Sequence, residues 1–300
     1  MFNENLWWVY DGGIAVILLV FMFISIRKNL IKNMVSFAGF LLAAAVAFSV
    51  SGGIAESVYK GTTRDSNIKT LSNKMDSEAF INELAFYLED LDYSLNINTL
   101  KFEETLRKDD KVSENIYKYV NNVNGRVVDT AENFEEKLHE GYADVFGKMT
   151  EKHISKYALE FAKKEIVENP SAFEKLVPLM LDNENMKPAA EYICTNFIDN
   201  AYINGFRITV FTILLVVIII VTILIAGAFG KNDKMEKNPV QHFFCALLGI
   251  GRGAVVAVGV TAVIRLSEIY GDNAERFFGS AAVDKTYVFK YIYDLISNMK

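Results

Sequence analysis

The sequence has few of the residues that disulfide and metal chemistry require. Its 300 residues include two cysteines and three histidines. Cys194 lies in a polar stretch and Cys245 in an apolar one, so an intrachain disulfide is not expected, and neither cysteine stands at a metal-ligand spacing. The sequence therefore indicates no metal and no cofactor.

Positive charge is also scarce. Residues 56–205 hold 18 Lys and Arg against 28 Asp and Glu, a net charge of −10, and this excess of acid argues against binding of that segment to nucleic acid or anionic lipid. No Lys or Arg precedes Arg27, so the chain starts without the basic region of a cleavable signal peptide. We interpret the first apolar segment, which Arg27 and Lys28 follow, as a retained membrane anchor.

Hydrophobic residues, by contrast, form long runs at both ends of the chain. Residues 208–230 contain no ionisable side chain over 23 positions, and residues 240–264 form another run after a short loop. At a rise of about 1.5 Å per residue the first of these runs reaches about 34 Å, enough to cross a hydrocarbon core of about 30 Å. Its many β-branched residues suit a strand, but strands rarely exceed about ten residues, so we expect a membrane-spanning helix.

A matching pair of apolar runs occupies residues 9–26 and 34–54. Aromatic residues precede the first run, as they do at membrane interfaces: Trp7, Trp8 and Tyr10. The connectors 27–33 and 231–238 each hold three Lys or Arg, so the positive-inside rule places both in the cytoplasm. Both termini and the long segment between the two pairs are then predicted to lie outside.

The long middle segment, residues 55–205, has apolar residues at helical spacing. Three stripes recur with a period of 3.6 residues: Phe80, Leu84, Tyr87, Leu88 and Leu91; Phe134, Leu138, Tyr142 and Val145; and Ile154, Tyr157, Ala158 and Phe161. Asp129 with Glu132 resembles a capping box. The last helix, residues 189–206, is expected to continue into the third span, because only Gly205 stands between them.

Together these patterns predict an all-α protein of the cell membrane with four helical spans. Its predicted parts are a membrane hairpin at residues 1–54, an inserted extracytoplasmic helical bundle at 55–205, a second hairpin at 206–265 and an amphipathic helical tail at 266–300. The tail is aromatic, with Phe277, Phe278, Tyr287, Phe289, Tyr291 and Tyr293, and it has a stripe of apolar residues at helical spacing, Val288, Ile292, Leu295 and Met299. We expect the tail either to lie in the outer interface or to dock on the outer bundle.

Two residue patterns superficially resemble catalytic or metal motifs. Glu136 and His139 have the spacing of a di-iron helix, but the sequence offers no second copy, so we interpret them as a solvated helix face. Gly249, Gly251 and Gly253 lack the strand and the Gly-Lys-Ser/Thr of a phosphate loop, and the spacing of Gly249 and Gly253 suits close helix packing in lipid. The inserted domain has no Ser, Cys or zinc nucleophile motif, so we expect no enzymatic activity.

Several hairpin features occur together in one order. They are Asp11 before the first span, a basic connector, Gly39 in the second span and a glycine-rich signature, Leu247-Leu248-Gly249-Ile250-Gly251-Arg252-Gly253, in the last span. In these features the chain resembles the colicin V production protein family, over about residues 7–60 and 206–300 but not in the inserted domain. The resemblance implies an inner-membrane protein linked to toxin production or export and to envelope tolerance, without catalytic activity.

Arg252 is placed near the middle of the fourth predicted span, where insertion scales set about 2.5–3.5 kcal/mol against a lone arginine. We expect either Thr222 or carbonyls freed by a helix break at Gly249 and Gly251 to compensate its charge. A pair with Asp11 requires the fourth helix to be tilted, broken or displaced outward. A re-entrant segment around Arg252 is the alternative to a full span.

Two classes of function remain open at this point. The first is a non-enzymatic membrane scaffold or accessory factor in toxin production or export and envelope homeostasis, whose outer domain binds an extracytoplasmic protein. The alternative is a small-solute or proton-coupled transporter that uses Asp11 and Arg252. We favour the scaffold, because the spans offer few polar groups for a path. The expected partners are the lipid bilayer and an unknown protein, with no nucleic acid; small-residue helix faces leave a homo-oligomer open.

Overall fold

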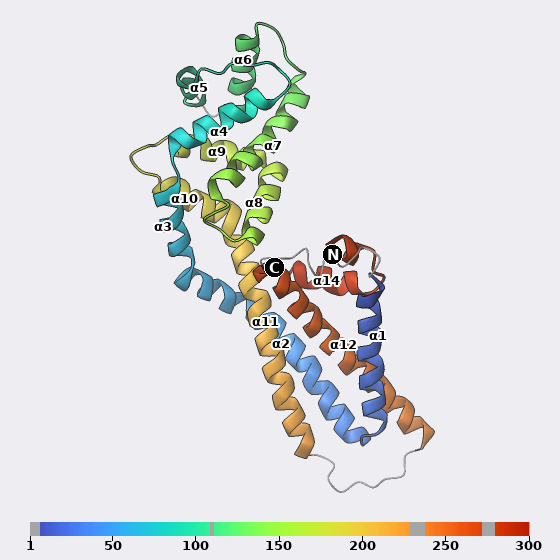
Figure 1. Cartoon of the computed structure of the whole chain (residues 1–300). Coiled ribbons are helices and arrows are strands. Elements are labelled where there is room, and N and C mark those ends of the chain that lie inside the picture. Colours follow the sequence, from blue (N-terminus) through green and yellow to red (C-terminus); the bar gives the residue numbers. More distant parts are fainter. Residues whose placement is uncertain (1–6, 109–110, 229–237, 272–279, 300) are drawn as a thin grey trace. The chain divides into compact units, whose positions relative to one another are not determined.

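The computed structural model describes residues 7–108, 111–228, 238–271 and 280–299 (Figure 1). Within these residues the regular structure is helical and includes no strand, which agrees with the predicted all-α class. The chain divides into two compact units, the first comprising residues 1–58 and 203–300 and the second residues 59–202. The second unit is therefore slightly shorter at both ends than the predicted insertion, residues 55–205.

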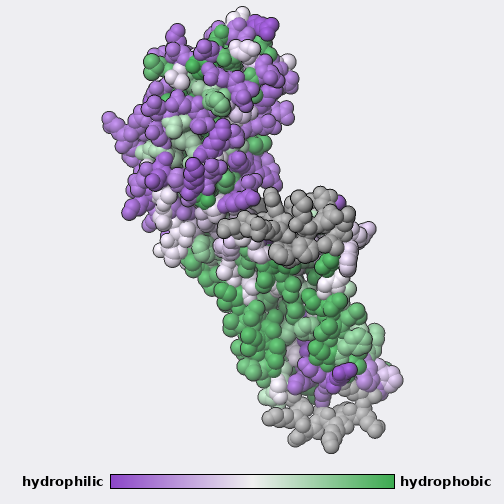
Figure 2. Space-filling model, in the orientation of Figure 1, coloured by the Kyte–Doolittle hydropathy of each residue, from purple (hydrophilic) through white to green (hydrophobic). Residues whose placement is uncertain are grey.

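Four long helices make up most of the first unit. They are α1 (Trp8–Ile26), α2 (Leu30–Thr62), α11 (Asp199–Ala228) and α12 (Pro239–Tyr270). Each belongs to a helix long and apolar enough to cross a membrane, and Figure 2 shows hydrophobic side chains over their surface, which suits contact with lipid. These are the properties of a membrane protein. The end of the third predicted span and the connector at 231–237 lie outside the described residues.

The third of these helices begins well before its apolar part. Helix α10 (Lys187–Ile193) continues through a π-helical turn at Cys194–Ile198 into α11, so that one helix of 42 residues runs from Lys187 to Ala228. The predicted continuation across Gly205 is confirmed. Within the second unit, the Asp199 carboxylate of this helix accepts hydrogen bonds from Tyr59 Oη at 2.6 Å and Arg64 Nε at 2.9 Å.

The tail packs inside the first unit. Two short helices follow α12, namely α13 (Ser280–Asp284) and α14 (Phe289–Ser297). An apolar cluster joins α14 to α1 and α12 and includes Ile14, Ala257, Val283 and Phe289. The predicted tail stripe is partly wrong, because Val288 and Leu295 are 51% and 57% exposed whereas Phe289 and Ile296 are buried. The covered face is therefore shifted from the predicted stripe but still includes Ile292, which packs on the cluster, and Met299, which is buried. Phe277 and Phe278 lie outside the described residues.

The second unit is a set of helices around an aromatic core. Its helices are α3 (Arg64–Lys74), α4 (Ser77–Asp90), α5 (Thr99–Leu106), α6 (Val112–Asn124), α7 (Ala131–Thr150), α8 (Lys156–Glu168), α9 (Pro170–Met180) and α10. Its largest fully buried side chains include Phe80, Phe102, Phe134, Tyr142, Phe173 and Phe197. Ile154 of the third predicted stripe is buried in this core but lies before α8, because Ser155 caps that helix through the N–H of Ala158.

Candidate functional site

Arg252 is buried in the first unit, and its hydrogen-bond partners within the described residues are uncharged. Its side chain is 3% exposed. Its Nη2 donates to Asn33 Oδ1 at 2.7 Å and to Ser25 Oγ, while its Nε is enclosed without a hydrogen-bond partner. No carboxylate in the described part of the chain forms an ion pair with it. Two oxygen dipoles thus take the place of a counter-charge.

Asn33 makes this contact a junction of three helices. Its Nδ2 donates to the carbonyls of Ser25 at 2.7 Å and Lys28 at 3.2 Å, at the end of α1 and in the connector to α2. Its Oδ1 is thereby left to face the guanidinium of Arg252 on α12. Because buried amide and guanidinium groups are costly when unpaired, this arrangement favours one position of α12 against the α1–α2 turn.

The predicted partners of Arg252 are wrong. Thr222 lies instead against Gly39 on α2, so close that a Cβ added at Gly39 would collide with the threonine side chain. Helix α12 is unbroken from Pro239 to Tyr270, so a break at Gly249 and Gly251 supplies no carbonyls and the chain does not turn back at this point.

The structure also changes the depth in the membrane that was predicted for Arg252. Cys245, about two turns earlier in α12, already reaches the connector, where its Sγ lies 3.7 Å from the carbonyl of Lys28. The first turns of α12 therefore extend past the end of α1. The guanidinium lies level with the last turn of α1, where an arginine is less costly than at the centre of a span.

The glycines around Arg252 allow close helix contacts. A Cβ on Gly249 would lie 2.6 Å from the carbonyl oxygen of Phe21, and one on Gly253 would lie 3.1 Å from Cα of Leu18. Both glycines therefore face α1, at the four-residue spacing that suits such packing. Gly251 instead faces the ring of Phe37 on α2.

Asp11 lies at the other end of α1 and caps α14. Its Oδ2 accepts from the N–H of Tyr287 at 2.7 Å, and its Oδ1 accepts from the N–H groups of Val288 at 3.0 Å and Phe289 at 2.9 Å. Phe289 is the first residue of α14, Val288 is its N-cap and Tyr287 precedes it, so Asp11 binds the amides at the start of this helix, where a helix supplies no partner of its own. Asp11 does not reach Arg252, because the 14 positions from Asp11 to Ser25 correspond to about 21 Å of helix.

A second polar contact holds α14 on α12. Arg265 Nη1 donates to Glu268 Oε2 at 2.8 Å and to Tyr293 Oη at 2.7 Å, and the tyrosine hydroxyl donates to the same carboxylate. The side chains of Arg265 and Glu268 are 17% and 9% exposed. Burial raises the pKa of Tyr293, so this phenol stays protonated and can act as the donor.

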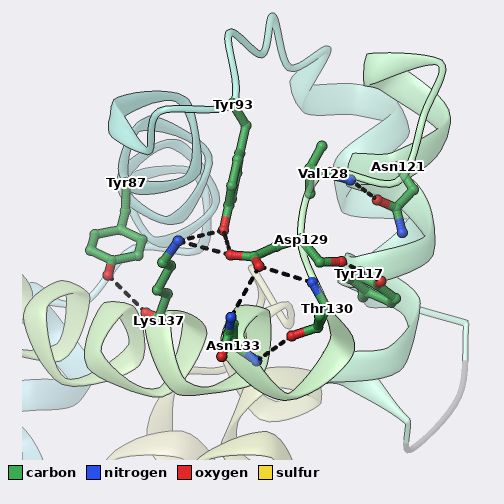
Figure 3. Close-up of polar contacts among 9 residues, drawn as sticks. All are labelled: Tyr87, Tyr93, Tyr117, Asn121, Val128, Asp129, Thr130, Asn133 and Lys137. Atoms are coloured by element: carbon green, nitrogen blue, oxygen red, sulfur yellow. Dashed lines mark hydrogen bonds and ion pairs between the residues drawn. The ribbon is translucent and has the colours of Figure 1, made fainter.

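The second unit contains a charged cluster at the start of α7 (Figure 3). Asp129 Oδ2 accepts from Tyr93 Oη at 2.8 Å and Lys137 Nζ at 2.9 Å, and Lys137 also donates to Tyr93 Oη at 2.9 Å. The predicted capping box is wrong, because Thr130 is the N-cap and its Oγ1 accepts from the N–H of Asn133. Asp129 instead ties the segment before α7 to the loop after α4.

The protonation states of this cluster favour a structural role. The hydrogen bond from Lys137 holds the pKa of Asp129 well below its usual range. Its bonds to Tyr93 and Asp129 raise the pKa of Lys137 above its usual range. Both groups therefore stay charged near neutral pH, whereas a general acid or base needs a pKa near the operating pH.

Glu136 and His139 line an open acidic depression on α7, together with Glu132, Glu135, Glu140 and Val167. The residues with described positions contain no group of three or more side chains that could hold a metal ion. The structure therefore assigns this pair no ligand beyond solvent.

Sequence reasoning singled out Asp11, Arg252 and the glycines, but it connected neither Ser25 nor Asn33 with Arg252 and did not find the backbone amides that Asp11 binds. Ser25 and Asn33 are polar residues beside a connector, which is a weak signal. The fold and these contacts define an all-helical protein with four helices able to cross a membrane, in which polar side chains join helix to helix. No family model matches the chain, and no curated protein or solved structure does so either.

Proposed function

We propose that the protein is a non-enzymatic membrane scaffold or accessory factor whose second unit binds a protein partner on the outer side of the cell membrane. The resemblance of its hairpins to the colicin V production family supports a role in toxin production or export and in envelope homeostasis. The hydrophilic surface of the second unit (Figure 2) suits a domain in water.

The observation that carries this proposal is that Asp11 and Arg252 both bind other groups of the protein. A transport path would need both groups to face a substrate or a proton. Asp11 instead caps α14, and Arg252 binds Asn33 and Ser25. They lie near opposite ends of α1, so neither supports the other along a common path. This arrangement favours the scaffold over the transporter.

The proposed topology has both termini and residues 59–202 outside, with the connectors at 27–33 and 231–238 inside, and it rests on the positive-inside rule. Cys194 and Cys245 are buried, so a cysteine introduced at the exposed Asn183 gives a specific signal. We expect a membrane-impermeant thiol reagent to label Asn183→Cys in intact cells and Pro239→Cys, the matched inner control, only after lysis. The reverse pattern would invert the topology.

The function is tested by two measurements on the full-length protein. A photo-crosslinker at Phe86, which is 59% exposed in the second unit, is expected to trap one recurrent protein in native membranes. Reconstituted vesicles are expected to show no solute or proton flux above protein-free vesicles. Flux that is lost in Asp11→Asn and in Arg252→Gln would establish the transporter and contradict the scaffold.

A further inference from the structure

Arg207 is a buried arginine that the proposed function does not use. It is 9% exposed and directly precedes the uncharged stretch 208–228 of α11. Its guanidinium carbon lies 5.4 Å from the centroid of the Phe48 ring on α2, and a Cβ on Gly52 would come within 3.3 Å of that carbon. The charge is thus packed against an aromatic ring and a glycine of α2.

No anion among the residues with described positions balances this charge. None of their carboxylates forms an ion pair with Arg207, and its Nε is buried without a hydrogen-bond partner. Since burial of an uncompensated guanidinium is unfavourable, the site is suited to an anion from outside the chain.

The position of Arg207 along α11 indicates which anion it meets. From Arg207 to Ala228 the helix rises about 32 Å, close to the thickness of the hydrocarbon core. When this stretch fills the core, the guanidinium lies at the core boundary, next to the phosphates of the lipid headgroups. The planar N–H fork of arginine suits phosphate oxygens.

We propose that Arg207, supported by Phe48 and Gly52, binds a phosphate group, supplied either by a phospholipid headgroup or by free phosphate. Phe48 holds the guanidinium by a cation–π contact. Gly52, which has no Cβ, lets the guanidinium lie against α2. The inference does not depend on the proposed function, because both a scaffold and a transporter can carry a lipid site.

The test measures thermal unfolding of delipidated full-length protein in detergent, for the wild type, Arg207→Met and the control Arg126→Met. Arg126 is an exposed arginine of the second unit. Added phosphatidylglycerol is expected to raise the melting temperature of the wild type and of Arg126→Met by about 3 °C or more, and that of Arg207→Met by much less. In lipid-free detergent Arg207→Met should melt at or above the wild type, because it no longer buries an unpaired charge.

Two further additions identify the source of the phosphate. Inorganic phosphate that reproduces the increase in the wild type would identify free phosphate as the ligand, whereas an increase with phosphatidylglycerol only would identify the headgroup. Diacylglycerol, which has acyl chains but no phosphate, should give no increase that depends on Arg207. Equal lipid responses of the wild type and Arg207→Met, or no response of the wild type to either phosphate source, would overturn the proposal.

Discussion

Removing the Asp11 carboxylate should loosen the start of α14 without unfolding either unit. Replacement of a capping side chain by alanine costs about 0.5–2 kcal/mol, and Asp11 performs this role for α14 from α1 through three N–H groups. Tyr287 and Val288 are exposed, so their amides can turn to water, which keeps the loss in that range. A loss of about 1–2 kcal/mol corresponds to a local opening equilibrium about 5–30 times larger.

Hydrogen exchange measures that equilibrium directly. Peptides covering residues 287–290 should exchange about 5–30 times faster in Asp11→Ala than in the wild type. Asp11→Asn keeps one side-chain acceptor oxygen and should give an intermediate rate. Peptides from α7 serve as the internal control and should not change. If residues 287–290 exchange equally fast in the wild type and Asp11→Ala, the burial of Phe289 and Ile296 alone fixes α14, and our account of Asp11 is wrong.

Four further outcomes are expected. Gly249→Ala should lower the apparent melting temperature through overpacking worth about 1–3 kcal/mol against Phe21, whereas Gly227→Ala, with no atom within 4 Å of the added Cβ, should not; equal melting temperatures would contradict the close packing. Arg252→Ala should lower the level of inserted protein, and Arg252→Lys should preserve part of it, because a positive charge can still reach Asn33; a fully stable Arg252→Leu would show the arginine to be incidental. Residues 59–202 expressed alone should give a helical circular-dichroism spectrum with cooperative melting. The pKa of Asp129 is depressed in the folded protein, so its contribution to the free energy of unfolding is complete above the ordinary pKa of about 3.9 and is lost as the pH falls below that value. Lys137→Met should therefore weaken the acid dependence of stability. An acid dependence that is the same in Lys137→Met and the wild type would contradict this account of Asp129.

The membrane helices and the main core positions could be predicted because each follows from a local pattern. An uncharged run such as 208–228 needs only its length to indicate a span, and the stripe from Phe134 to Val145 needs only its period to indicate a buried face. The buried tail face was predicted less well, because Val288 and Phe289 are both apolar and only the docking partner decides which of them is covered.

The surroundings of Arg252 could not be predicted for a different reason. Its depth was counted from the start of α12, which assumes that the helix enters the membrane where it begins. In the structure the first turns of α12 extend past the α1–α2 turn, and Cys245 is already beside Lys28. The partners of Asp11 could not be predicted for a related reason. They are backbone amides, and because every residue except proline has one, the sequence does not indicate which of them Asp11 binds.

The contacts of Arg252 also constrain the order in which the protein can assemble. They join α12 to residues 219 and 227 positions earlier in the chain. During synthesis α1, α2 and the whole of residues 59–202 are made before Arg252, whose guanidinium completes the contact among α1, α2 and α12. The first hairpin must therefore be in the bilayer for a time in which Asn33 has no guanidinium to bind. A chain that stops before Arg252 contains every residue of the second unit, yet it cannot complete the first, so membrane assembly is a late step that depends on the entry of α12.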